Sequence, residues 1–133
     1  NLMLGRISND LYDEGYYPVS SAQPSTACMA GRRNAFYDAP VVITVFTPRG
    51  WSYAPLDAGV CVANMMNAAW SLGLGSCVVS RAARTFATDA GRGLAARAGI
   101  PDDYEAQVHL VVGVPESTDA DPRGLYPNRV AWL

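Results

Sequence analysis

The sequence predicts one domain of the α+β class, in which helices and strands form three α/β/α layers. Segments with helical periodicity alternate with short, continuously apolar segments of the kind found in buried strands. The chain has 133 residues, of which 50% are hydrophobic and 17% charged, which suits one packed core and argues against disorder. We therefore treat residues 1–133 as a single domain.

The first part of the chain is expected to contain a helix, a long loop and a strand. Apolar residues three and four apart predict an amphipathic helix over 2–11. Pro, Ser and Gly are frequent in 16–35, which predicts a long mobile loop. Every residue from Val41 to Phe46 is β-branched or aromatic. Such a run predicts a central strand that is buried on both faces.

A long helix is predicted from Pro55 to about Leu72. Pro55 suits a first helical position, and Asp57 places a carboxylate where the helix dipole favours it. The helix is apolar on most sides and rich in small residues, so we expect it to be buried almost all round. A central core helix and a subunit-interface helix both fit this pattern.

Two more strands and a helix are predicted in the second half. A short strand covers 77–79, and Thr88 is a candidate N-cap for a helix that runs to about Ala98. The apolar run 108–114 predicts another buried strand, which contains the only histidine, His109. A histidine in such a run is more often a hydrogen-bonded core residue than a catalytic base.

Composition and cysteine spacing exclude several classes of function. All ten basic residues are arginines, and twelve acidic residues give a net charge of -2, so the chain has no basic excess for a nucleic acid. Cys28, Cys61 and Cys77 are too widely spaced for a zinc site and indicate reduced thiols in a cytoplasmic protein. The uncharged run 58–80 has Asn, Ser and Gly residues that argue against a membrane span. We expect no metal site, no membrane segment and no signal peptide.

Five short motifs follow one another between residues 36 and 115. They are FYDAPVVI at 36–43, LDAGV at 56–60, LGLGSC at 72–77, GIPDDYE at 99–105 and VGVP at 112–115. In this order they resemble the nitroreductase family of FMN-dependent oxidoreductases. The resemblance covers roughly residues 36–133, and the order of the motifs makes it specific.

The resemblance implies a nitroreductase-like fold with a central mixed sheet and a long buried helix at the interface of a homodimer. It implies that FMN lies between the subunits, that NAD(P)H reduces it, and that a small acceptor such as a nitro compound or a quinone then takes the electrons. This ping-pong chemistry belongs to the cofactor, so no catalytic side chain is assigned. The sequence agrees, because it has no GxSxG elbow and no Cys-His signature.

The resemblance also implies where FMN would bind. The cofactor-binding candidates are Ser76, Cys77, Val78, Val79, Ser80, Arg81, Arg123 and Arg129. In the family, backbone N–H groups of the segment that matches 78–80 lie near flavin N5 and O4. A basic-Pro-basic element near the C-terminus grips the FMN phosphate. Arg123 fits its first position, Leu125 stands at the second, and Arg129 is a nearby substitute.

The N-terminal part departs from the family pattern. Family members begin with a helix that carries an Arg-Arg-Ser-x-Arg element for the FMN phosphate, and this chain has none. Arg32 and Arg33 lie directly before a predicted strand and so in the wrong place. Because the chain begins at Asn1, we expect that an upstream part of the domain is absent. The alternative is a flavin-free dimerisation or small-ligand binding module that retains the fold.

Overall fold

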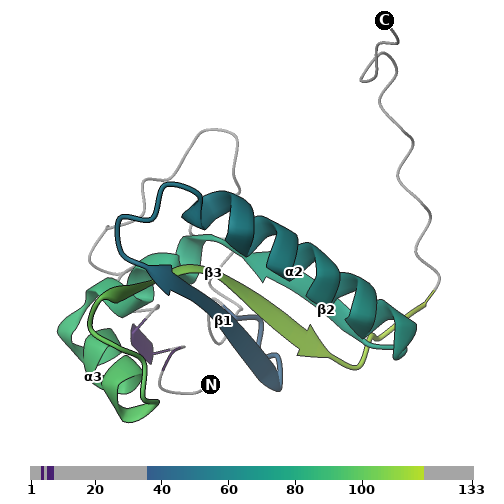
Figure 1. Ribbon diagram of the computed structural model, residues 1–133. Helices are drawn as coiled ribbons and strands as arrows, with labels where there is room; N and C mark the ends of the chain where they lie inside the picture. The colour runs from purple at the N-terminus through teal and green to yellow at the C-terminus, as the bar shows by residue number, and fades with distance from the viewer. Residues whose placement is uncertain (1–3, 5, 8–35, 119–133) are drawn as a thin grey trace, which may run out of the picture.

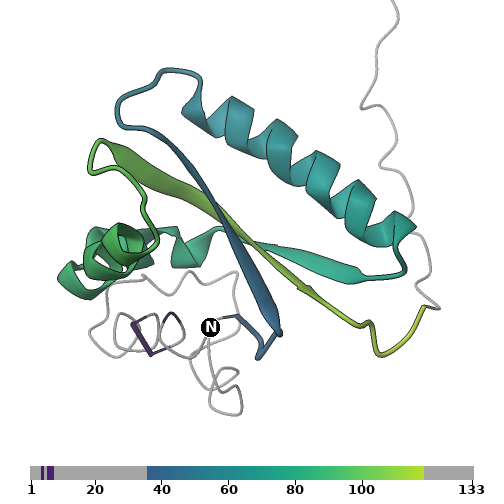
Figure 2. The ribbon, with the colours of Figure 1, turned by 60° about the horizontal axis from the view of Figure 1, so that its bottom comes forward.

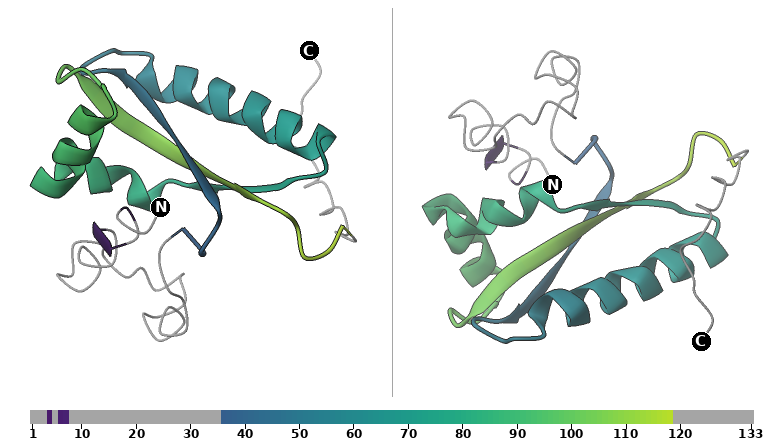
Figure 3. Two further views of the ribbon diagram at one scale, coloured as in Figure 1. Left: turned by 90° about the horizontal axis from the view of Figure 1, so that it is seen from below. Right: turned by 90° about the horizontal axis from the view of Figure 1, so that it is seen from above.

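The computed structural model describes residues 4, 6, 7 and 36–118, with the side chains of 81–83 left out. A three-stranded sheet lies in the middle. Helix α2 (Ala54–Ser71) covers one face, and the 3-10 helix η2 (Arg81–Ala87) and helix α3 (Asp89–Arg97) lie on the other (Figures 1 and 2). The two views of Figure 3 show the same separation of α2 from α3. The predicted three-layer α+β architecture is confirmed.

The sheet has the strand order β1-β3-β2, with β1 at Val41–Pro48, β2 at Gly75–Val79 and β3 at Tyr104–Gly113. Both pairings are antiparallel, so the expected mixed sheet shows no parallel pair among the described strands. The structure places β3 at the centre. Its start at Tyr104 is earlier than predicted, because the first residues of β3 pair with the end of β1.

β1 lies at an edge of the described sheet, which corrects the expectation of a central strand at 41–46. Val41 and Ile43 are 47% and 37% exposed, so the strand is not buried on both faces. The reason is geometric. One helix is about 10–12 Å wide with its side chains, whereas three strands spaced by about 4.8 Å present a wider face.

Helix α2 begins and ends within one residue of its predicted bounds. Pro55 and Asp57 lie in its first turn, as predicted, and Asp57 Oδ2 accepts a 2.8 Å hydrogen bond from Trp51 Nε1. Gly73 follows the helix with a φ of 72°, a conformation that glycine adopts without strain. The buried residues are Ala54, Ala58, Val62 and Ala69.

The expectation that α2 is buried almost all round is wrong for this chain alone. Leu56 and Trp70 are 63% and 67% exposed, because only one side of the helix contacts the sheet. The small residues Ala54, Ala58 and Ala69 are on the buried side. They therefore allow α2 to pack closely on the sheet.

A second core lies on the opposite face of the sheet, around His109. This side chain is fully buried, with its ring 5.3 Å from the ring of Phe36 and 5.9 Å from that of Phe86. Thr44 Oγ1 and His109 Nδ1 are hydrogen-bonded at 2.8 Å. Leu4, which is 8% exposed, belongs to the hydrophobic cluster that contains Phe36. The interpretation of His109 as a hydrogen-bonded core residue is confirmed.

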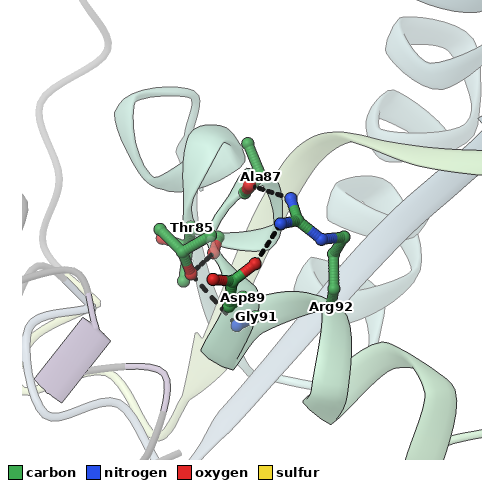
Figure 4. Close-up of polar contacts among 6 residues, drawn as sticks. Thr85, Ala87, Asp89, Gly91 and Arg92 are labelled. Carbon is green, nitrogen blue, oxygen red and sulfur yellow. Dashed lines mark hydrogen bonds and ion pairs between the residues drawn. The ribbon is translucent and has the colours of Figure 1, made fainter.

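Helix α3 starts at the predicted cap. Thr88 Oγ1 accepts a 3.0 Å hydrogen bond from the backbone N–H of Gly91, and the helix ends just before Ala98. Arg92 donates to the Asp89 carboxylate and to the carbonyl oxygen of Ala87, which ties the first turn of the helix to the preceding segment (Figure 4). The 3-10 helix before it has no counterpart in the sequence-based prediction.

Two of the predicted segments lie wholly or mostly outside the described residues. The loop predicted at 16–35 lies entirely outside them. Of the helix predicted over 2–11, the described residues Leu4, Arg6 and Ile7 are helical, and Leu4 and Ile7 are buried. Within the part of the chain that the structure describes, no helix has the length and apolar character needed to cross a membrane.

Candidate functional site

The candidate site is built on β2 and the residues that follow it. Residues 76–79 lie within β2, Ser80 is exposed between β2 and η2, and Arg81 is the first residue of η2. The predicted segment is therefore one continuous stretch of strand that leads into a helical turn. Arg123 and Arg129 lie outside the described residues.

Backbone groups of β2 are available along one edge of the strand. β3 is its single partner among the described strands. In an antiparallel pair, alternate residues direct their N–H and C=O groups away from the partner strand. The outer edge of β2 therefore offers both donors and acceptors, which is the chemistry needed to bind the edge of a planar heterocycle.

Side chains of β2 anchor the strand rather than line one common pocket. Val79 is 7% exposed and packs in the cluster that contains Val111. Val78 points to the other face, where it lines a groove of about 330 Å³ beside α2 together with Val62 and Met66. Val78 is 42% exposed, so the packing of Val79 and the pairing with β3 hold the backbone of β2 in place. The polar groups that remain for a ligand are mainly those of the backbone.

A separate cavity of about 430 Å³ lies at the start of β2. Ser76 and Cys77 line it together with Tyr37 and Asp38. The structure therefore divides the candidates: atoms of Ser76 and Cys77 line this cavity, whereas Val78 lines the groove beside α2. Tyr37 and Asp38 have φ angles of 56° and 55°, a region that residues other than glycine rarely adopt. The sequence-based reasoning did not detect this strained pair.

Metal chemistry finds no support in the described residues. No group of three or more His, Cys, Asp or Glu side chains comes together in this part of the chain. Cys61 and Cys77 are exposed free thiols.

The fold and the site together define a class of protein. It is a three-layer α+β domain whose described residues make the outer edge of β2 available to a ligand and form no cluster of catalytic side chains. The chain matches the family model described as the nitroreductase family over residues 11–114. This protein belongs to the nitroreductase family. No curated protein matches the chain.

The solved structures that share the fold include three nitroreductases. A nitroreductase with bound FMN from Bacteroides fragilis is 16% identical, with a TM-score of 0.76 over 99% of this chain and 71% of that one. A nitroreductase with bound FMN from Desulfitobacterium hafniense is 19% identical, with a TM-score of 0.78 over 98% of this chain and 68% of that one. An FMN-dependent nitroreductase from Clostridium difficile is 20% identical, with a TM-score of 0.67 over 98% of this chain and 73% of that one. The nitroreductase-like fold predicted from the motifs is confirmed.

Proposed function

We propose that this protein is an FMN-dependent oxidoreductase that takes hydride from NAD(P)H and passes electrons to a small acceptor, such as a nitro compound or a quinone. The observation that carries the proposal is the family match over 11–114, which includes all of β2 and Ser80. Two of the structures with the same fold contain FMN. A bound FMN would supply the hydride chemistry itself.

The donor set on β2 fits the edge of a flavin ring. Within the segment from Val78 to Ser80, the backbone N–H groups that point away from β3 would bind ring atoms that gain electron density on reduction, and fixed dipoles favour that charge. Because Val79 packs in the core and β2 pairs with β3, the outer backbone groups of β2 need little reorganisation when a ligand binds. This chain's own residues would therefore bind and orient the flavin ring.

A flavin titration tests the proposal. The full chain is mixed with FMN, and flavin fluorescence and the visible spectrum are recorded during the titration. We expect saturable quenching and a protein-bound flavin band that NADH or NADPH bleaches. A chain that folds but leaves the FMN signal unchanged would support the flavin-free binding module instead.

Arg123→Ala is expected to weaken FMN binding. An FMN phosphate carries nearly two negative charges, and loss of one charged hydrogen-bond partner costs about 1.5–3 kcal/mol. At 1.4 kcal/mol per decade, the dissociation constant should rise roughly ten- to a hundredfold. Fluorescence titration at two salt concentrations is the measurement, since a phosphate contact weakens with screening.

Arg129→Ala is the comparison variant for Arg123→Ala. A loss of affinity in Arg129→Ala alone would move the phosphate contact to Arg129. Unchanged affinity in both variants would remove the C-terminal segment from the site. The free energy of unfolding should change by no more than about 0.5 kcal/mol in either variant if both side chains are on the surface.

We propose that the protein forms a homodimer through the exposed face of α2. Residues spaced four and three apart form one stripe along this face: Leu56, Val60, Ala63, Asn67 and Trp70. All are exposed, and Leu56, Val60 and Trp70 are between 56% and 67% exposed. Monomers rarely leave a large apolar patch open to water, and a twofold partner would cover this one with the same surface.

Val60→Glu is expected to shift the protein from dimer to monomer. The substitution places a carboxylate in the middle of the apolar stripe, and the twofold axis brings two such charges together. Sedimentation at micromolar concentration should give twice the chain mass for the wild type and the chain mass for the variant. Ala90→Glu is the matched control, because it adds the same charge to an exposed position of α3. A monomeric wild type would overturn the proposal.

The free thiols support a reducing compartment. Cys61 and Cys77 are both exposed and unpaired by any disulfide. Disulfides form readily in oxidising compartments, whereas exposed reduced thiols are common in the cytoplasm. We therefore propose a cytoplasmic location.

A further inference from the structure

One row of side chains crosses all three strands on the face of the sheet that carries η2 and α3. Thr44 of β1 and Val79 of β2 are each paired with His109 of β3, so the three residues are neighbours across the sheet. Directly opposite residues of an antiparallel pair have their side chains on the same face. His109 therefore lies between β1 and the last residue of β2, which immediately precedes Ser80.

The ring of His109 also contacts the helix that follows Ser80. Phe86 belongs to η2 and stacks on the imidazole, with ring centroids 5.9 Å apart and an angle of 28° between the ring planes. Ser80 lies between Val79 and the first residue of η2, so His109 neighbours the elements on both sides of it. One side chain thus holds the backbone of Ser80 from both ends.

A hydrogen bond fixes the plane of this ring. Thr44 Oγ1 and His109 Nδ1 are 2.8 Å apart. The χ2 angle of a histidine has only a broad preference, so packing alone defines the ring plane loosely, whereas a hydrogen bond at one ring nitrogen selects it. Because Phe86 stacks on that plane, the position of η2 depends on the Thr44 hydroxyl.

We propose that His109 is a positioning residue for flavin. Through its hydrogen bond with Thr44 and its stack with Phe86, it sets the place and direction of the Ser80 backbone. The consequence for flavin rests on the proposed function, because Ser80 belongs to the segment that would bind the ring. His109 is fully buried, so it acts through its neighbours and not as a catalytic residue. Its contribution is preorganisation, since a backbone donor that is already oriented binds a ligand at lower cost.

Three variants of β1 separate this role from packing. Thr44→Val keeps the branched shape of the side chain and removes the hydroxyl, whereas Thr44→Ser keeps the hydroxyl and removes a methyl group. Thr47→Val is the matched control on the same strand. Thr47 is 7% exposed, and its Oγ1 has no hydrogen-bond partner in the part of the chain that the structure describes. A change seen in Thr44→Val alone therefore follows the lost hydrogen bond.

Residual dipolar couplings of backbone N–H groups measure the first effect, because they report the direction of each bond. In the full chain without FMN, we expect the couplings of Ser80 and Phe86 to change in Thr44→Val. They should keep their wild-type values in Thr44→Ser and Thr47→Val. Urea unfolding should still show lower stability for Thr44→Ser, which loses a methyl group. Equal changes at Ser80 in all three variants, or no change in Thr44→Val, would overturn the proposal.

Titration with FMN, followed by flavin fluorescence, measures the consequence for binding. The dissociation constant should rise about two- to thirtyfold in Thr44→Val, which is the usual size of an effect carried through packed side chains. Thr44→Ser and Thr47→Val should bind FMN with an affinity close to that of the wild type. An unchanged affinity in Thr44→Val would contradict a role of His109 in flavin binding.

The two measurements distinguish this inference from the proposed function. The couplings need no flavin, so they decide by themselves whether the contact between Thr44 and His109 orients Ser80. A wild-type chain that does not bind FMN would contradict the oxidoreductase proposal and, with it, the consequence for flavin. A wild-type chain that binds FMN, with couplings and affinity unchanged in Thr44→Val, would contradict the positioning role alone.

Discussion

Gly91→Ala is expected to destabilise the protein strongly, by about 3 kcal/mol. A Cβ atom at this position would lie 2.1 Å from the backbone oxygen of Thr85 and 2.7 Å from the Cα atom of Phe86. Both are backbone atoms of η2, so no side chain can rotate away to make room. Helix α3 would have to move off η2, and the hydrogen bond from the Gly91 N–H to Thr88 Oγ1 would be lengthened (Figure 4).

Gly93→Ala is the matched control for Gly91→Ala. Gly93 lies two residues further along the same helix, and a Cβ atom there would meet nothing within 4 Å. The substitution should raise the free energy of unfolding by about 0.5–1 kcal/mol, because alanine favours the helix over glycine. Urea unfolding followed by circular dichroism measures both variants. Equal effects of the two substitutions would contradict the close contact between α3 and η2.

Phe36→Ala is expected to cost about 3–5 kcal/mol of stability. Phe36 is fully buried, and its ring contacts His109 at the centre of β3. Truncation would leave a cavity in the hydrophobic cluster that also contains Val79. Since Val79 lies at the end of β2, loss of this cluster should also loosen the strand that we propose for flavin binding.

Tyr37→Ala serves as the neighbouring control. Tyr37 is 51% exposed, so its truncation should change the free energy of unfolding by about 0.5 kcal/mol at most. The midpoints of urea unfolding are compared between the two variants. The comparison requires that the dependence of the unfolding free energy on urea concentration be the same in both. Similar losses from both variants would mean that the fold does not depend on the contact between Phe36 and β3.

Hydrogen-exchange protection of the β2 amides provides a further readout for Phe36→Ala. We expect lower protection in this variant than in Tyr37→Ala at those β2 amides whose N–H groups pair with β3. Such a difference would show that the core beneath the candidate site holds the strand in place. Equal protection in the two variants would mean that the stability of β2 does not depend on this core.

Local sequence signals determined where most elements begin and end. Pro55 and Gly73 bound α2, and Thr88 and Gly99 bound α3, because capping and termination depend on backbone groups only a few residues away. The apolar run that contains His109 identified a buried strand for the same local reason. The order of the five motifs went further and led to the family, which the match over 11–114 then showed.

The tertiary structure alone decided how these elements are arranged. β3 rather than β1 became the central strand, and α2 kept one apolar face exposed, because pairing and coverage depend on residues far apart in the chain. A cavity beside Arg49 and Arg84 joins residues from two strands and two helices, so no spacing in the sequence reveals it. Local chemistry therefore set the elements of this protein, and long-range packing set which of their surfaces are left for ligands and partners.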